Sequence, residues 1–374
     1  MNIENVRVDH FRIPLPVVLS DSTHGEMSHF GLVTVRIDRT DGQQGLGYTY
    51  CVGDIGGDAI RSLVERELVP VLLGLPSDAV EEIWDRMWWH LHFVGRGGIA
   101  AFAMAAVDIA LWDLRAKSVD QPLWRFLGGE DPNVTAYAGG IDLQFSLDEL
   151  EAQTRGFLDS GFRAIKMKVG RDQLGEDVER VTAMRDWLGS EIALMADANM
   201  RWTVEEAISA ARALQACDLT WLEEPTIPDD VEGHARIARD GGIPIATGEN
   251  LHTVYEFEHM IANGGVAFPE PDVATIGGIS PWLQVARAAQ KANLPVTTHG
   301  VHDLQVHLLA AAPNASYLEV HGFGLDRFMA EPLLIEDGMA RAPERPGHGV
   351  ELDWEALAPN QVVGGSSTSG CANL

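Results

Sequence analysis

The sequence predicts an α/β protein in which a (β/α)₈ barrel follows a mixed α+β segment. Before residue 130, a hairpin-like stretch precedes long helical segments. From residue 133, eight short β-rich runs alternate with helical stretches, and ionisable residues end all but the first of these runs. Strands that alternate with helices form a parallel sheet, and eight such units close into a barrel.

The first 130 residues combine strand and helix signals. Residues 32–50 read as two alternating runs around Asp41-Gly42, which is a hairpin signal. Helical periodicity then predicts helices over 59–72, 79–93 and 99–117. Gly128-Gly129 ends this part, so we expect an α+β capping domain over residues 1–130.

The eight β-rich runs define a barrel domain over residues 131–323. A helical stretch lies in nearly every gap between them. The runs are NVTAYAGGI (133–141), RAIKMKVG (163–170), IALMADAN (192–199), LTWLEEP (219–225), IPIATGEN (243–250), VAFPEPDV (266–273), LPVTTHG (294–300) and SYLEVHG (316–322). After residue 323 the pattern stops, and residues 324–374 read as a short strand, loops and a Pro/Gly-rich return segment. We expect the tail from about residue 364 to be disordered.

Composition excludes several classes of function. The chain has 27 basic and 55 acidic residues and a net charge of −28, which argues against a nucleic-acid partner. No apolar stretch reaches the length of a membrane span, and the first residues do not resemble a secretory signal. The three cysteines are far apart in the sequence, which fits a reducing compartment. We therefore expect a cytoplasmic protein with no membrane partner.

The polar residues at the strand ends keep step with the barrel repeat. They recur at intervals of about 20 to 29 residues, one βα unit each, so every unit after the first delivers a polar group to the C-terminal mouth of the barrel. Scattered surface charges would not follow the repeat. The residues are Lys166, Lys168, Asp197, Asn199, Glu223, Glu249, Asp272, His299 and Glu319.

Three consecutive strands supply the carboxylates Asp197, Glu223 and Glu249. Carboxylates that converge repel one another, and a hard divalent cation such as Mg²⁺ relieves the repulsion. These three residues are therefore the predicted metal ligands. Asn199 shares the face of Asp197 and is suited to donate a hydrogen bond to the substrate, whereas Glu224 should face away from the mouth.

Two candidate bases flank the predicted metal. Lys168 lies next to Lys166 and near the cation, which predicts a lowered pKa. His299 lies beyond the metal-bearing strands, and Asp272 is placed to accept its ring N–H. A substrate carboxylate at the cation would lose its α-proton to one of these bases, and the cation and Lys166 would stabilise the enediolate. Glu319 is expected to donate a hydrogen bond to the substrate carboxylate.

Seven motifs in this order resemble the enolase superfamily, and within it the mandelate racemase subgroup. The resemblance covers almost the whole chain. It implies a modified (β/α)₇β barrel whose cap combines the N-terminal segment and the C-terminal return. It also implies Mg²⁺, with Mn²⁺ as a substitute, and a homo-oligomer that in this family is often an octamer. The motifs are AAVDIALWDLRAKSVDQPLWRFLGG, KMKVG, ADAN, WLEEP, GEN, PDVATIGGIS and TTHG.

Within the subgroup, the sequence is most similar to acid-sugar dehydratases of the L-talarate/galactarate type. KMKVG, AGG at 138–140 and VHDLQVHL at 301–308 carry this similarity. It implies a small carboxylate substrate that becomes a 2-keto-3-deoxy acid, with His299 or Lys168 as the acid that protonates the departing hydroxyl. The cap loop at 19–30 does not indicate which sugar binds, although His24 within it is a candidate substrate contact.

Other outcomes stay open at this point. Two bases on opposite faces of a carbon permit racemisation or epimerisation of a 2-hydroxy acid, or cycloisomerisation of a sugar lactone, as readily as β-elimination. A catalytically silent barrel that only binds ligands is the third possibility. The presence of the three carboxylates, both lysines and the Asp272–His299 pair argues against it.

Overall fold

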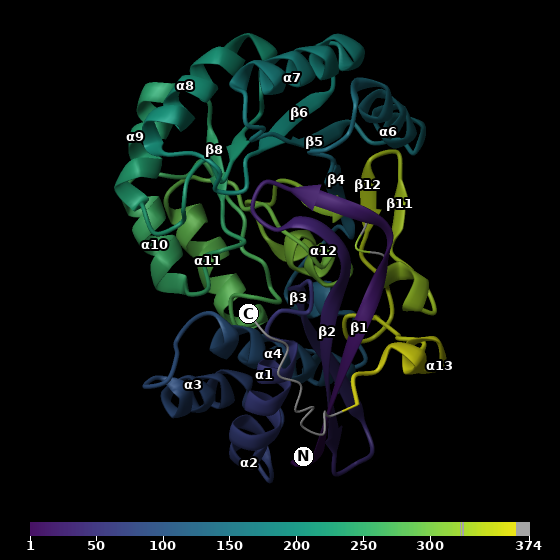
Figure 1. Ribbon diagram of the computed structural model, residues 1–374. Helices are drawn as coiled ribbons and strands as arrows, with labels where there is room; N and C mark the ends of the chain where they lie inside the picture. The colour runs from purple at the N-terminus through teal and green to yellow at the C-terminus, as the bar shows by residue number, and fades with distance from the viewer. Residues whose placement is uncertain (322, 324, 364–374) are drawn as a thin grey trace, which may run out of the picture.

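The computed structural model describes residues 1–321, 323 and 325–363. A barrel of parallel strands is surrounded by helices α6 to α11, and a smaller cap lies against one side of it (Figure 1). The long β1–β2 hairpin of the cap reaches to the barrel opening (Figure 1). Within the described residues, no helix is both long and apolar enough to cross a membrane.

The cap is built on an antiparallel sheet of β1 (Ile3–Asp21), β2 (Gly25–Arg39) and β3 (Gln44–Val52). Asp38 pairs with Gln44 at the β2–β3 turn, so the predicted hairpin around Asp41-Gly42 is confirmed. Gly45 and Gly47 on β3 let helix α4 pack closely, because a Cβ at either position would lie within 2.3 Å of a backbone carbonyl oxygen of that helix.

The cap helices cover the sheet, and all three predicted helical stretches are confirmed. The stretch predicted over 59–72 contains one wider turn, η1, just before Pro70, which has no N–H to continue the regular pattern. The helices are α1 (Gly57–Leu63), η1 (Val64–Leu68), α2 (Val69–Leu72), α3 (Val80–Leu91), α4 (Ile99–Lys117) and α5 (Leu123–Phe126).

The barrel strands pair in parallel in the order β10-β4-β5-β6-β7-β8-β9. They are β4 (Asn133–Gly139), β5 (Ala164–Lys168), β6 (Ala193–Asp197), β7 (Leu222–Glu223), β8 (Ile245–Thr247), β9 (Phe268–Pro269) and β10 (Leu318–His321). The helices between them are α6 (Leu147–Asp159), α7 (Leu174–Leu188), α8 (Val204–Leu214), α9 (Val231–Gly241), α10 (Val254–Ala262), α11 (Ile279–Lys291) and α12 (His302–Ala311). A short turn, η2 (Gln215–Cys217), follows α8.

The run 294–300, predicted as the seventh barrel strand, forms only an isolated bridge from Val296 to Ala315. Pro295 lacks an N–H, which shortens regular pairing here. The segment still closes the barrel, because Thr297 donates its N–H to Pro269 and Thr298 donates to Tyr317 on the other side. The predicted (β/α)₇β arrangement is therefore confirmed, with an irregular seventh member.

The C-terminal return joins the cap to the barrel. The strands β11 (Leu334–Glu336) and β12 (Met339–Arg341) form a hairpin that extends the barrel sheet next to β4. The short elements around it are η3 (Leu325–Phe328), α13 (Trp354–Leu357) and η4 (Ala358–Asn360). The predicted boundaries at 130/131 and 323/324 stay predictions, and the predicted disordered tail lies outside the described residues.

Side chains that point into the barrel form two layers. Because side chains alternate along a strand, Ala164, Met195 and Trp221 point the same way as residues two positions farther along. The first layer is apolar and buried, and the second carries Lys166, Asp197 and Glu223. The indole Nε1 of Trp221 donates to Glu223 (2.9 Å) and links the layers. The packing of the apolar layer thus fixes the level along the barrel axis at which the charged side chains meet.

A buried carboxylate holds the cap to the C-terminal return. Asp113 on α4 is fully buried and accepts hydrogen bonds from the N–H of Leu46 (2.9 Å), the N–H of His348 (3.0 Å) and the ammonium of Lys117 (2.6 Å). Each of these donors belongs to a different stretch of the chain, so one side chain connects β3, α4 and the return segment.

Asp113→Ala should lower the free energy of unfolding by about 3 kcal/mol, because two buried N–H groups lose their acceptor. Urea denaturation would measure this loss. The control is Glu151→Ala, which removes an exposed pair with Arg155 and should cost less than about 1 kcal/mol. A loss below about 1 kcal/mol for Asp113→Ala would contradict the role given to this residue.

Candidate active site

The predicted site residues converge on the mouth of the barrel. A cavity there is lined by six of them, namely His24, Lys168, Asn199, Glu249, His299 and Glu319. Including its opening to solvent, about 450 Å³ of space around the cavity side chains is free of protein atoms. The remaining predicted residues are at most 1% exposed and lie behind its lining: Lys166, Asp197, Glu223 and Asp272.

The three predicted metal ligands lie together. Asp197, Glu223 and Glu249 each offer an oxygen, and these oxygens lie within 4.8 Å of one another. Burial raises the pKa of Glu223 to about 7, and the nearby Asp197 adds to the rise. Carboxyl groups packed this closely favour a bound positive charge, and an all-oxygen donor set suits Mg²⁺ or Mn²⁺. The residues present therefore fit a hard divalent cation.

Lys166 is the buried counter-charge of this group. Its Nζ lies 2.6 Å from Glu223, 2.8 Å from Glu319 and 3.9 Å from Asp197. Burial disfavours the ammonium form, but Glu223 and Glu319 outweigh it and raise the pKa of Lys166 well above its ordinary value. This agrees with the prediction that one of the two lysines neutralises negative charge at the mouth.

Lys168 contacts Asp197, the first of the three predicted metal ligands. Its Nζ lies 2.5 Å from Asp197 Oδ2. Burial favours the neutral amine, yet this carboxylate raises the pKa of Lys168, so the predicted lowering of the pKa is wrong for this set of side chains. The prediction counted Lys166 and a cation as neighbours but did not count the direct contact with Asp197.

His299 contacts Glu249, the last of the three predicted metal ligands. Its Nδ1 lies 3.0 Å from Asp272, as the sequence predicts, and its Nε2 lies 3.0 Å from Glu249. Burial lowers the pKa of His299, but Glu249, Glu319 and Asp272 together raise it well above the ordinary value. Lys168 and His299 thus lie at opposite ends of the carboxylate group, and both hold protons.

Glu319 accepts hydrogen bonds at the mouth. Gly300 donates its N–H to Glu319 Oε2 (2.9 Å), and Lys166 contacts Oε1. Burial raises the pKa of Glu319, but Lys166 and His299 outweigh it and hold the pKa well below the ordinary value. An ionised carboxylate only accepts, so donation by Glu319 to a substrate carboxylate requires that Glu319 first takes up a proton, and this role stays a prediction.

Asn199 and Glu224 follow two neighbouring strands. Asn199 lines the cavity, and its buried Oδ1 has no hydrogen-bond partner among the residues that the structure describes, which leaves it available to a ligand. Glu224 does not line the cavity, and its carboxylate accepts from the Asn250 amide (2.9 and 3.1 Å). Asn199 thus keeps its predicted place in the site, and Glu224 remains outside it.

The cap loop that contains His24 lies over the cavity. Asp21 accepts from the backbone of His24 (2.6 Å) and contacts its ring Nδ1 (2.8 Å), which raises the pKa of the imidazole. Ser22 donates to the carbonyl of Ala198 (2.7 Å), and Thr23 donates to that of Asn199. These bonds hold the tip of the β1–β2 hairpin against strand β6 of the barrel.

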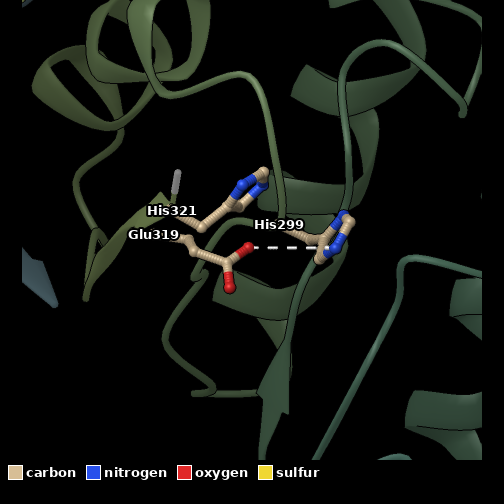
Figure 2. Close-up of side chains that lie close together, drawn as sticks. All are labelled: His299, Glu319 and His321. Carbon is tan, nitrogen blue, oxygen red and sulfur yellow. Dashed lines mark ion pairs between the residues drawn. The ribbon is translucent and has the colours of Figure 1, made fainter. Parts of the chain in front are cut away.

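Three side chains near the reacting groups escaped the sequence analysis. The Tyr50 hydroxyl, from the cap, donates to Asp272 (2.7 Å) and lies 3.3 Å from His299 Nδ1. Glu270 is buried, and its Oε1 has no hydrogen-bond partner within the described part of the chain. His321 lines the cavity and forms a cluster with His299 and Glu319 (Figure 2).

A pattern in the sequence could have identified two of these three residues. Glu270 and His321 lie two positions from Asp272 and Glu319, on the same faces of their segments, so period two could have identified them. Tyr50 comes from a cap strand far away in the sequence. No local pattern indicates that it reaches the barrel.

Two family models match this chain. The model described as mandelate racemase / muconate lactonizing enzyme, N-terminal domain, matches residues 3–128. The model described as enolase C-terminal domain-like matches residues 149–356. The two matches cover the cap sheet and helices and nearly all of the barrel.

Relatives share the chain almost from end to end. A 3,6-anhydro-alpha-L-galactonate cycloisomerase of Streptomyces coelicolor is 55% identical over 95% of this chain and 98% of its own length. An L-talarate/galactarate dehydratase of Salmonella typhimurium is 34% identical over 96% of this chain and 92% of its own. A crystal structure of a Streptomyces coelicolor racemase with bound magnesium is 54% identical, with a TM-score of 0.94 over 96% of this chain and 100% of that one.

Asp197→Asn should weaken Mg²⁺ binding by roughly tenfold or more, because one of three convergent anionic ligands becomes neutral. Calorimetric titration of the purified protein with MgCl₂ would measure the affinity. Glu205→Gln is the matched control, since this exposed carboxylate pairs with Arg236 on the outer surface and should leave the affinity unchanged. An unaltered affinity in Asp197→Asn would remove this residue from the metal site.

Proposed function

Since this chain belongs to the mandelate racemase/muconate lactonizing enzyme family of the enolase superfamily, as its motifs predicted, we propose that it acts on a sugar-derived carboxylate. The proposed enzyme removes the proton α to the carboxylate and expels an oxygen from the neighbouring β-carbon. One observation carries the proposal: Lys168 and His299 contact opposite ends of the group formed by Asp197, Glu223 and Glu249.

When bound by the three carboxylates, Mg²⁺ would polarise the substrate carboxylate. It would also compete for the negative charge of Asp197 and Glu249, which pairs with Lys168 and His299 when no cation is bound. We assign removal of the α-proton to Lys168, at the Asp197 end of the group. His299 is assigned the proton that the departing oxygen takes up, because Asp272, which is not one of the predicted metal ligands, contacts Nδ1 and favours the protonated ring. Lys166 balances negative charge that builds up on the substrate.

The identity of the departing oxygen decides the name of the reaction. In a 3,6-anhydro-galactonate the β-oxygen belongs to a ring ether, so its loss opens the ring and gives a 2-keto-3-deoxy isomer. In an open-chain acid sugar it is a hydroxyl, so its loss releases water. The same two candidate bases and the same charge at the mouth can act in both cases.

Ring-opening isomerisation of an anhydro-aldonate is the first candidate, because the 55% identical relative carries that activity in its name. A cycloisomerase of a sugar lactone is one of the alternatives that the sequence leaves open, and a ring ether follows the same chemistry. Dehydration of an aldonate or aldarate is the second candidate, supported by the 34% identical dehydratase.

The assembly of this chain into a homo-oligomer remains a prediction.

A substrate screen tests the proposal. The purified protein with Mg²⁺ would be incubated in D₂O with 3,6-anhydro-L-galactonate, galactarate and related acid sugars, and the products examined by proton NMR and mass spectrometry. A 2-keto-3-deoxy acid of unchanged formula supports the isomerase, and one that has lost water supports the dehydratase. Deuterium at the α-carbon without a keto product would indicate a racemase or epimerase. No exchange and no product from any acid sugar would refute the proposal.

The assigned roles predict different losses for the two bases. Lys168→Ala should abolish both product formation and α-proton exchange, each by about 10²- to 10⁴-fold. His299→Asn should reduce product formation by a similar factor but retain α-proton exchange, because it lacks only the acid for the leaving oxygen. Both rates come from one NMR time course in D₂O. If His299→Asn loses exchange and Lys168→Ala keeps it, the roles are reversed.

A further inference from the structure

His321 places an imidazole in the wall of the active-site cavity. Both ring nitrogens are inaccessible to solvent and have no hydrogen-bond partner among the described residues. The residue ends strand β10, two positions after Glu319, and its ring lies beside that of His299 with centroids 6.0 Å apart (Figure 2). A neutral imidazole carries one donor and one acceptor, and leaving both unpaired in the interior costs folding free energy.

Aromatic side chains hold this ring in place. The ring of Phe323 packs edge-on against His321, with centroids 4.2 Å apart, and itself packs on Tyr50 and Phe30. A second hollow, lined mainly by apolar and aromatic side chains, lies on the other side of this wall and shares His321, Tyr50 and Phe323 with the active-site cavity. Packing therefore fixes the orientation of the imidazole without satisfying its nitrogens.

Burial lowers the pKa of His321 to about 3, so the ring is neutral near pH 7. A neutral ring adds no charge to the mouth, unlike His299. It offers a hydrogen bond to an uncharged oxygen, and sugars carry such oxygens as hydroxyls and ring ethers. The three carboxylates predicted to bind the metal lie elsewhere in the site, and so does Lys168. In the proposed reaction the metal binds the substrate carboxylate and Lys168 removes the α-proton, so neither part of the substrate needs His321.

We propose that His321 binds a hydroxyl or ring-ether oxygen of the substrate beyond its α-carbon, and so selects sugar-derived acids over simpler 2-hydroxy acids. This inference rests on the proposed function. The unpaired imidazole in the cavity wall is the observation that carries it. A site that presents a buried polar group rejects ligands that cannot pair with it, because the group then stays unsatisfied.

The test compares the wild type with His321→Phe and His321→Asn on galactarate, 3,6-anhydro-L-galactonate and 2-hydroxybutanoate, which lacks the further oxygens. Binding is measured as the ligand-induced shift in Tm, and KM and kcat are measured for any acid sugar that is turned over. His321→Phe should bind the acid sugar at least tenfold more weakly, with its unliganded Tm equal to or above that of the wild type. Its preference for the acid sugar over 2-hydroxybutanoate should shrink by the same factor. His321→Asn should recover most of the binding.

His234→Asn is the matched control. This fully buried histidine on α9 also has an unpartnered ring nitrogen but does not line the cavity, so its substitution should change acid-sugar binding less than twofold. Equal binding by the wild type and His321→Phe would overturn the inference alone. The inference would also be overturned if His321→Phe bound the acid sugar more weakly with a lowered unliganded Tm and His321→Asn did not restore the binding. If the wild type neither binds nor converts any acid sugar, the proposed function fails as well.

Discussion

The ammonium of Lys166 is the charge on which the mouth of the barrel depends. It is 1% exposed, contacts Glu223 and Glu319, and lies 3.9 Å from Asp197. A buried ion that loses its partner destabilises a protein by about 3 to 5 kcal/mol, so the carboxylates and this lysine stabilise one another. The centre of the Tyr137 ring lies 5.2 Å from the Lys166 Nζ. Tyr137 belongs to the apolar layer that packs below the charged side chains inside the barrel. The site is thus a charged layer held in register by the packing below it.

The mouth is complete only with the cap in place. Tyr50 donates to Asp272, which also contacts the ring of His299, so a cap residue helps to orient a catalytic candidate of the barrel. On the opposite side, Ser22 and Thr23 bind backbone carbonyls at the end of β6. The cap therefore forms hydrogen bonds with the barrel mouth on two sides, from the tip of the β1–β2 hairpin and from β3. A shift of the cap would be transmitted to the Asp272–His299 pair.

Period two and the repeat length were sufficient to predict most of the site. They placed Lys166, Asp197 and Glu223 on one face of successive strands, because the barrel forces strand ends to meet. They failed where the result depends on contacts between distant segments. Tyr50 arrives from the cap, and the raised pKa of Lys168 follows from a contact whose distance no sequence pattern specifies. The prediction of a regular seventh strand was wrong for a local reason, because Pro295 interrupts the pairing that the apolar run suggested.

The two candidate reactions make unequal demands on the acid. A hydroxyl that leaves as water can diffuse away, whereas a ring-ether oxygen stays tethered to the product. A tethered nucleophile has a very high effective concentration, so the ring would close again unless the oxygen is protonated as it departs. The arrangement around His299 meets this demand, since Asp272 contacts Nδ1 and favours a proton on the ring. His321, beside it, offers a neutral hydrogen bond that could hold the freed oxygen away from the β-carbon. A ring-opening enzyme therefore needs these two histidines together more than a dehydratase does.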